Sequence, residues 1–158
     1  MRLKLILLLI LSGAIFQACS TTSQYILEQA LEKQKEETVL EEKDGANQRL
    51  HDIWYATHIK GVPTNRSLPI PRLELNLSNM SVLGYDGCNE FYGRIHKISA
   101  TEITFDKIVS PQKACADMKH PNHFNQAIGE VTAYKLDGLK LSFLNHKGKE
   151  ILIFLKGD

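Results

Sequence analysis

Three cysteines, Cys19, Cys88 and Cys115, carry the chemistry that could most readily define a site in this 158-residue chain. A cysteine nucleophile needs a base beside it, and no histidine is spaced so that it must lie next to Cys88. The two remaining fates of such a pair are a disulfide and two buried thiols. We therefore expect a structural role for Cys88 and Cys115, and Cys19 belongs with the leader that precedes it.

His120 and His123 form the second group whose spacing could support chemistry. Two histidines three or four residues apart on a helix can begin a zinc site, and Asp117 could join them. No recognisable metal motif surrounds them, so we interpret them as surface histidines near the start of a helix. The sequence also lacks a glycine-rich phosphate loop, a serine elbow and paired metal-binding cysteines. We predict neither an enzyme nor a cofactor.

The first 18 residues have the features of a secretory signal. Arg2 and Lys4 precede an unbroken apolar run over residues 5–11, and small residues follow. The apolar run is too short to cross a bilayer, which takes about 20 residues. The leader ends at Ala18-Cys19, which resembles the lipobox of bacterial lipoproteins, although an ordinary signal peptide with an incidental cysteine has the same leader.

This resemblance implies that Cys19 becomes the lipidated first residue of the mature chain. One acyl chain binds a membrane marginally and two or more bind it stably. Ser20 is not an acidic sorting signal, so we expect the outer membrane of a cell envelope. Removing Arg2 and Lys4 from the 19 basic residues leaves 17 against 18 acidic ones, a net charge near −1. No basic stripe carries interleaved aromatic residues, which argues against nucleic-acid binding.

Export has a consequence for the other two cysteines. Disulfides persist in oxidising compartments outside the cytoplasm. With Cys19 assigned to lipid, Cys88 and Cys115 remain as a possible pair. We predict a Cys88–Cys115 disulfide, and two unbridged thiols are the alternative.

Two segments follow the leader. Residues 19–48 form a lipidated start and a charged linker rich in glutamate and lysine, which favours partial helix. The linker is a solvated tether or, alternatively, a short partner-binding helix. Residues 49–158 form the globular domain, where short β-prone runs alternate with turn residues. The runs lie at 53–59, 73–77, 81–85, 91–98, 102–105, 108–109, 132–136, 139–144 and 151–155, with a loop over 61–71 and a helix over 121–131.

This pattern predicts a mainly β fold of the α+β class. The expected architecture is a small, antiparallel, barrel-like sheet with one inserted helix. Leu73, Leu75 and Leu77 alternate with polar residues, as in a half-buried strand. Pro121 suits the first turn of the helix, where its missing N–H costs nothing.

One segment resembles a known family. Gly87-Cys88-Asn89, followed by Phe91 and Gly93, is similar to the signature of the META domain, the HslJ-like family. Trp54 upstream, Lys113-Ala114-Cys115 and the later apolar strands follow in the family's order. Pro111 and Pro121 depart from its usual threonine and glutamate, which weakens any role for that carboxylate. The side chain of Asn89 can bond local backbone and hold a turn, and the glycines permit positive φ or close approach.

The resemblance implies a non-enzymatic, monomeric envelope protein. Its family is linked to stress response and antibiotic tolerance, which suggests support of the envelope through binding an envelope protein or an apolar ligand. The alternative is a partner-binding or inhibitor lipoprotein that acts on a secreted or envelope protein. A cavity inside the domain would favour a small ligand, and a filled core would favour protein contacts.

Overall fold

The computed structural model describes residues 23–34, 45–111 and 113–157. The chain divides into two compact units, residues 1–41 and 42–158. The predicted signal peptide and Cys19 lie outside the described residues. In the first unit, residues 23–34 are helical and every one of them is exposed. No helix in the described part of the chain is long and apolar enough to cross a bilayer.

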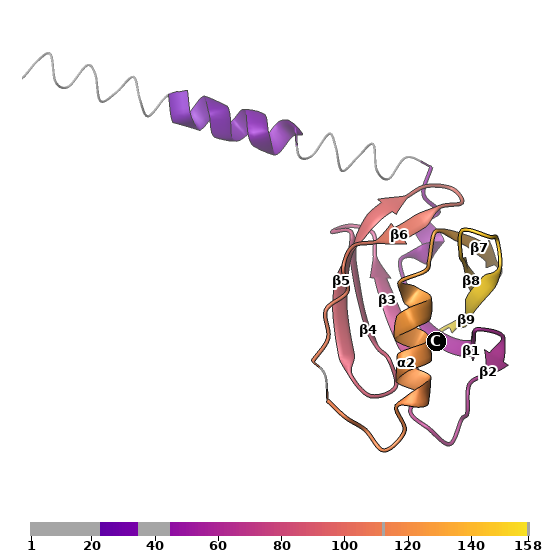
Figure 1. Ribbon diagram of the computed structural model, residues 1–158. Coiled ribbons are helices and arrows are strands. Elements are labelled where there is room, and N and C mark those ends of the chain that lie inside the picture. The colour runs from indigo at the N-terminus through magenta and orange to yellow at the C-terminus, as the bar shows by residue number, and fades with distance from the viewer. Residues whose placement is uncertain (1–22, 35–44, 112, 158) are drawn as a thin grey trace, which may run out of the picture. The chain divides into compact units, whose positions relative to one another are not determined.

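The second unit is built on one antiparallel sheet of nine strands, which confirms the predicted mainly β, barrel-like fold (Figure 1). The order is β6-β5-β4-β3-β1-β9-β8-β7, with β2 paired to β1. The strands are β1 (Ile53–Ile59), β2 (Val62–Pro63), β3 (Arg72–Asn76), β4 (Ser81–Tyr85), β5 (Glu90–Ile98), β6 (Ile103–Phe105), β7 (Ala133–Asp137), β8 (Lys140–Leu144) and β9 (Glu150–Lys156). A 3-10 helix, η1 (Gln48–Leu50), precedes them.

The two end strands of this order, β6 and β7, nearly close the sheet on itself. Glu102 and Ala133 form an isolated antiparallel bridge. The Tyr134 N–H donates to the Thr101 carbonyl at 2.9 Å, and its hydroxyl donates to the Ser99 carbonyl at 2.8 Å. Closure removes most of the free strand edge that an open sheet would expose.

Strand alternation fills the interior of the barrel. Leu73 and Leu75 on β3 are fully buried while their neighbours are half-buried, as predicted. Phe143 and Phe154 pack edge to face with ring centroids 5.5 Å apart. Trp54 is 1% exposed, and its indole N–H donates to the Leu50 carbonyl of η1. Aromatic side chains therefore occupy the middle of the domain.

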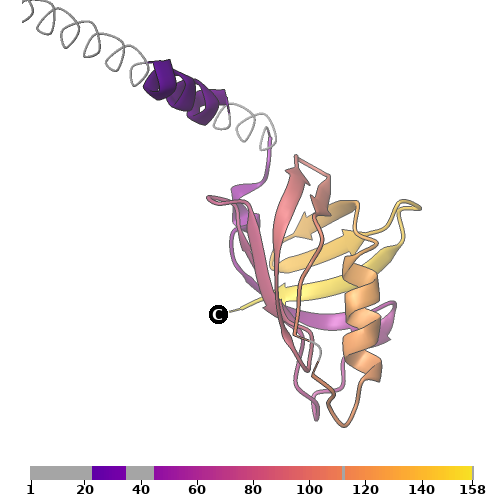
Figure 2. The same cartoon turned by 60° about the vertical axis from the view of Figure 1, so that its left-hand side comes forward.

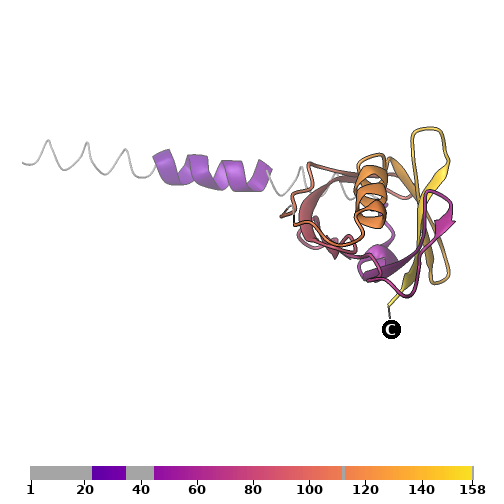
Figure 3. The ribbon, with the colours of Figure 1, turned by 60° about the horizontal axis from the view of Figure 1, so that its bottom comes forward.

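Helix α2 (Lys119–Ile128) covers the inner side of the curved sheet (Figures 2 and 3). Phe124 is fully buried and contacts the rings of Phe91 on β5 and Phe154 on β9. The predicted bounds of 121–131 are wrong at both ends. The helix ends at Ile128. Val131 continues the apolar spacing and is buried, but it lies in the turn that follows the helix, so its burial does not mean that it is helical.

Two further predictions differ from the structure. Val62–Pro63, expected in a loop, forms the short strand β2 next to β1. Lys60 and Gly61 between them both have positive φ, 49° and 83°, which suits a two-residue hairpin. Ile108–Val109, expected as a β piece, makes only one bridge, from Val109 to Tyr92.

Candidate functional site

The Gly-Cys-Asn motif forms the tight turn between β4 and β5. The Asp86 N–H donates to the Asn89 carbonyl at 2.9 Å, which closes the turn. Asp86 Oδ1 accepts from the N–H groups of Cys88 at 2.7 Å and Asn89 at 2.6 Å. Gly87 has φ +103°, a conformation that favours glycine. The side chain of Asp86 therefore holds this turn.

Asn89 acts at long range instead of holding the turn as we expected. Its Oδ1 accepts from the Lys113 N–H at 3.0 Å, and its Nδ2 donates to the Lys113 carbonyl at 3.2 Å. This pair imitates a strand contact across 24 residues. A side chain of the right length can replace a backbone partner in this way and satisfy both polar groups of one residue.

The predicted disulfide between Cys88 and Cys115 is present, with Cα atoms 5.9 Å apart. It lies beside the Asn89–Lys113 pair, so two neighbouring links fasten the segment around residue 113 to the turn. Because Cys88 is bonded to Cys115, no free thiol remains there for the nucleophilic role considered at the outset.

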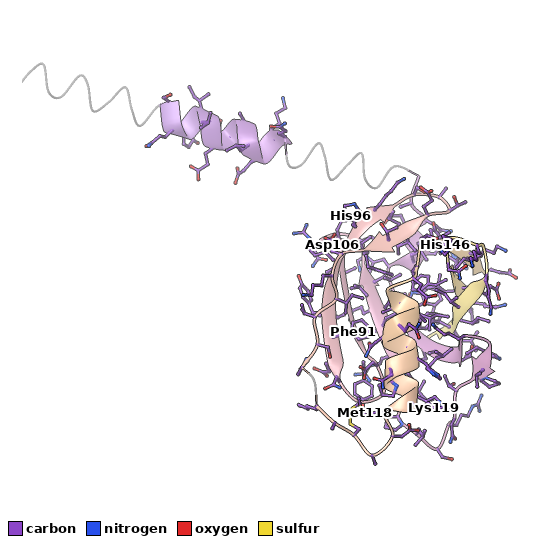
Figure 4. All side chains as sticks on the ribbon, viewed as in Figure 1. Phe91, His96, Asp106, Met118, Lys119 and His146 are labelled. Carbon is purple, nitrogen blue, oxygen red and sulfur yellow. A yellow bond between two sulfur atoms is a disulfide. The ribbon has the colours of Figure 1, made fainter. Side chains whose placement is uncertain are left out.

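The same turn is joined to helix α2. Asn125 Nδ2 donates to Asp86 Oδ2 at 2.7 Å, and Asp86 is 1% exposed. Phe91 lies between β5 and α2, with Met118 and Lys119 at the start of the helix (Figure 4). A Cβ on Gly93 would lie 2.9 Å from Ile108, so that glycine permits close approach. The motif thus connects a turn, a loop and a helix, which is a structural role.

Asp86 is the residue that reasoning from the sequence missed. The available signal was Asp-Gly at a turn, since an aspartate there often accepts from N–H groups two and three residues on. What the sequence did not indicate was the second oxygen's partner on α2, 39 residues away.

A small cleft of about 350 Å³ opens next to the disulfide. His120 and Asp117 lie at this cleft, with His120 Nδ1 3.2 Å from Asp117 Oδ2. The hydrogen bond from the Lys119 backbone N–H holds the pKa of Asp117 below its ordinary value, and the side-chain hydrogen bond from His120 contributes in the same direction. His123 is exposed. Among the described residues, no group of three or more histidine, cysteine or acidic side chains could hold a metal.

The outer face of the sheet carries a second feature, a row of exposed apolar side chains. Strand register places Ile53, Leu83, Tyr92 and Val109 in one line, interrupted by Glu74. We call these four apolar residues the outer row. Their exposed fractions are 41%, 41%, 49% and 52%. Directly opposed side chains on neighbouring strands interact, so Leu83, Tyr92 and Val109 form a contiguous apolar surface, and Glu74 separates Ile53 from it.

Two hollows border the outer row, of about 200 Å³ and 460 Å³. Leu83, Glu90 and Phe91 line both. On β3 and β4, the guanidinium carbon of Arg72 lies 5.3 Å from the centroid of the Tyr85 ring. Two neighbouring aromatic residues of β5 have different surroundings. Phe91 is 4% exposed and belongs to the core, whereas Tyr92 points outward because strand alternation places it on the opposite face.

Comparison with known proteins identifies the domain and its fold. The META domain family model matches residues 48–158. One NMR structure is 20% identical, with a TM-score of 0.54, and the match covers 68% of this chain and 90% of that one. An NMR structure of a protein from Burkholderia xenovorans is 17% identical, with a TM-score of 0.52 over 72% and 90% of the two chains. At these identities the likeness concerns the fold alone. No curated protein matches the chain.

Proposed function

The chain belongs to the META domain family, and from that premise we propose that it is an envelope lipoprotein whose domain works by binding a partner protein. In this proposal lipid on Cys19 anchors the chain to the outer membrane, and the protein supports the envelope under stress or antibiotic exposure. It performs no catalysis of its own.

The outer row is the observation that carries the binding role. Soluble domains rarely expose contiguous apolar surface without a function. Exposed aromatic and aliphatic side chains on the outer face of the sheet are suited to contact with a protein, and Tyr92 is the kind of amphipathic aromatic residue that is enriched in interfaces. In the interior of the domain, Phe154 packs against Phe124 and Phe143, and Trp54 is buried as well. A filled core favours protein contacts over an enclosed small ligand.

The polar side chains near the motif support a non-enzymatic role. The Asp86 side chain accepts from backbone N–H groups of the turn and from Asn125 of α2. The Asn89 side chain is hydrogen-bonded to the backbone of Lys113. Cys88 is in a disulfide. His120 and Asp117 form a partly exposed pair, and in the described part of the chain no third side chain is hydrogen-bonded to it as a hydrolytic triad would require.

A complementation experiment tests this function. A strain that lacks the protein is exposed to an antibiotic that damages the envelope, and variants are returned to it. We expect Leu83→Asp with Tyr92→Asp to fail, because a charge interrupts the apolar contact. Leu139→Asp is the matched control, since Leu139 is 61% exposed in the β7–β8 turn, away from the outer row.

The outcomes separate the parts of the proposal. Full rescue by the outer-row variant, at normal protein level, would refute the binding surface. Full rescue by Cys19→Ser would refute the need for an anchor. Loss of rescue by His120→Ala alone would point to the cleft and to chemistry there. The second possibility is that this protein inhibits an envelope enzyme. In that case the purified protein would also lower the activity of the purified enzyme when the two are mixed.

A further inference from the structure

The helix over residues 23–34 is amphipathic. At 3.6 residues per turn, Ile26, Leu27, Ala30 and Leu31 share one side of it. Ile26, Leu27 and Leu31 are 62%, 66% and 60% exposed. Glu28, Gln29 and Glu32 occupy the opposite side. We call the first four residues the apolar stripe.

The apolar stripe begins very close in sequence to the proposed anchor. Only residues 20–22 separate Cys19 from Ser23. An extended chain spans at most about 3.6 Å per residue, so the helix starts within roughly 14 Å of the acylated residue. No charged side chain occurs between Cys19 and Leu27. No charge in this stretch therefore opposes contact with lipid.

We propose that the apolar stripe lies in the interface of the same membrane that holds the lipid on Cys19, with the helix parallel to the membrane plane. This inference depends on the proposed anchoring. An amphipathic helix too weak to bind a membrane alone can bind when a tether keeps its local concentration high.

Charge identifies the kind of lipid surface. The helix carries Glu28 and Glu32 against the single cation Lys33. Anionic lipids attract basic segments, so this helix gains nothing from them. The stripe is therefore expected to enter a neutral phosphatidylcholine surface at least as well as one that contains phosphatidylglycerol.

Fluorescence quenching by brominated lipid tests the proposal in the acylated, full-length mature protein. Leu27→Trp places a reporter on the stripe, and Gln29→Trp places the same reporter on the polar side. Trp54 is buried in the domain and adds the same background to both variants. In phosphatidylcholine vesicles brominated on the acyl chains, we expect about twofold or greater loss of reporter signal for Leu27→Trp relative to Gln29→Trp, since an interfacial helix buries its apolar side about 5–10 Å deep.

A second pair of changes guards against a local effect of the reporter. Leu31→Asn, added to Leu27→Trp, should remove most of the extra quenching because it interrupts the stripe. Glu32→Asn, a similar change on the polar side, should leave the quenching in place.

Three results would overturn the inference. Equal quenching of both reporters, in protein whose Cys19 acylation is verified by mass spectrometry, would refute the interfacial helix and leave the anchor intact. An unmodified Cys19 in the mature protein would refute the anchor and the inference with it. Blue-shifted but unquenched emission from Leu27→Trp would show that the stripe packs against protein, such as a second copy of the helix.

Discussion

Replacing Asp86 should expose how much the domain depends on the turn between β4 and β5. In Asp86→Ala, the N–H groups of Cys88 and Asn89 lose their acceptor at a site where Asp86 is 1% exposed. An unpaired buried donor costs about 1–3 kcal/mol. Allowing for partial access by water, we expect the free energy of unfolding to fall by about 3 kcal/mol and the Tm to fall by roughly 10 °C.

Asp86→Asn separates the hydrogen bonds from the shape of the side chain. The asparagine oxygen can still accept from the two backbone N–H groups. Its amide nitrogen meets Asn125, whose exposed amide can rotate to present an oxygen. The free energy of unfolding should then fall by about 1 kcal/mol, because charge-assisted hydrogen bonds are replaced by neutral ones. Asp106→Ala, an exposed aspartate given the same change, should stay within about 0.5 kcal/mol of the parent.

Urea unfolding of the purified protein, followed by the fluorescence of buried Trp54, measures these differences. The order of stability should be parent, Asp86→Asn and then Asp86→Ala. If the alanine and asparagine variants lose the same free energy, or if the alanine variant loses less than about 1 kcal/mol, Asp86 does not hold the turn through its carboxylate oxygens.

Three further changes test other parts of the fold. Replacing Cys88 and Cys115 together by serine should cost about 3.5 kcal/mol on the chain-entropy model for a separation of 27 residues; a loss under about 1 kcal/mol in the same urea assay would mean that the unfolded loop is already restricted. Gly84→Ala should destabilise by about 3 kcal/mol or prevent folding, because a Cβ there would collide with the Phe91 ring and with the backbone carbonyl of Arg72; a thermal melt equal to that of the parent would refute this close packing. Asp52 forms an ion pair with Lys156 on β9, and the hydrogen bond from that lysine holds the pKa of Asp52 below its ordinary value. The ionised pair therefore contributes roughly 0.5 kcal/mol to the free energy of unfolding at neutral pH, and this contribution is lost as pH falls below about 4. The stabilities of the parent and Asp52→Asn should differ at pH 7 and converge near pH 2. A difference that stays constant with pH would contradict the assignment.

The element pattern of the domain could be predicted well from the sequence. Strands 53–59 and 81–85 match β1 and β4 in full. Alternation in β3 correctly placed Leu73 and Leu75 inside. Helix α2 was found but misplaced at its ends, because a buried turn residue continued its apolar periodicity.

The candidate site was less predictable because its contacts cross the chain. The disulfide could be inferred from three cysteines together with a predicted secretory leader. The partner of Asn89 could not, since its amide meets the backbone of a residue 24 positions away. Asp86 gave only a local turn signal, and its contact with α2 depends on how the helix packs.

By itself, the sequence determined the properties that depend on local order and covalent chemistry. Alternation of apolar residues specifies which side of a strand is buried, and the Gly-Cys-Asn motif with Trp54 specifies the family. Tertiary structure alone decided which distant segments meet. The outer row exists because antiparallel register aligns Ile53, Leu83 and Tyr92 across separate strands. Register depends on the turns and on which faces of the paired strands are buried together, so it is a property of strand pairs and not of any single segment of the chain.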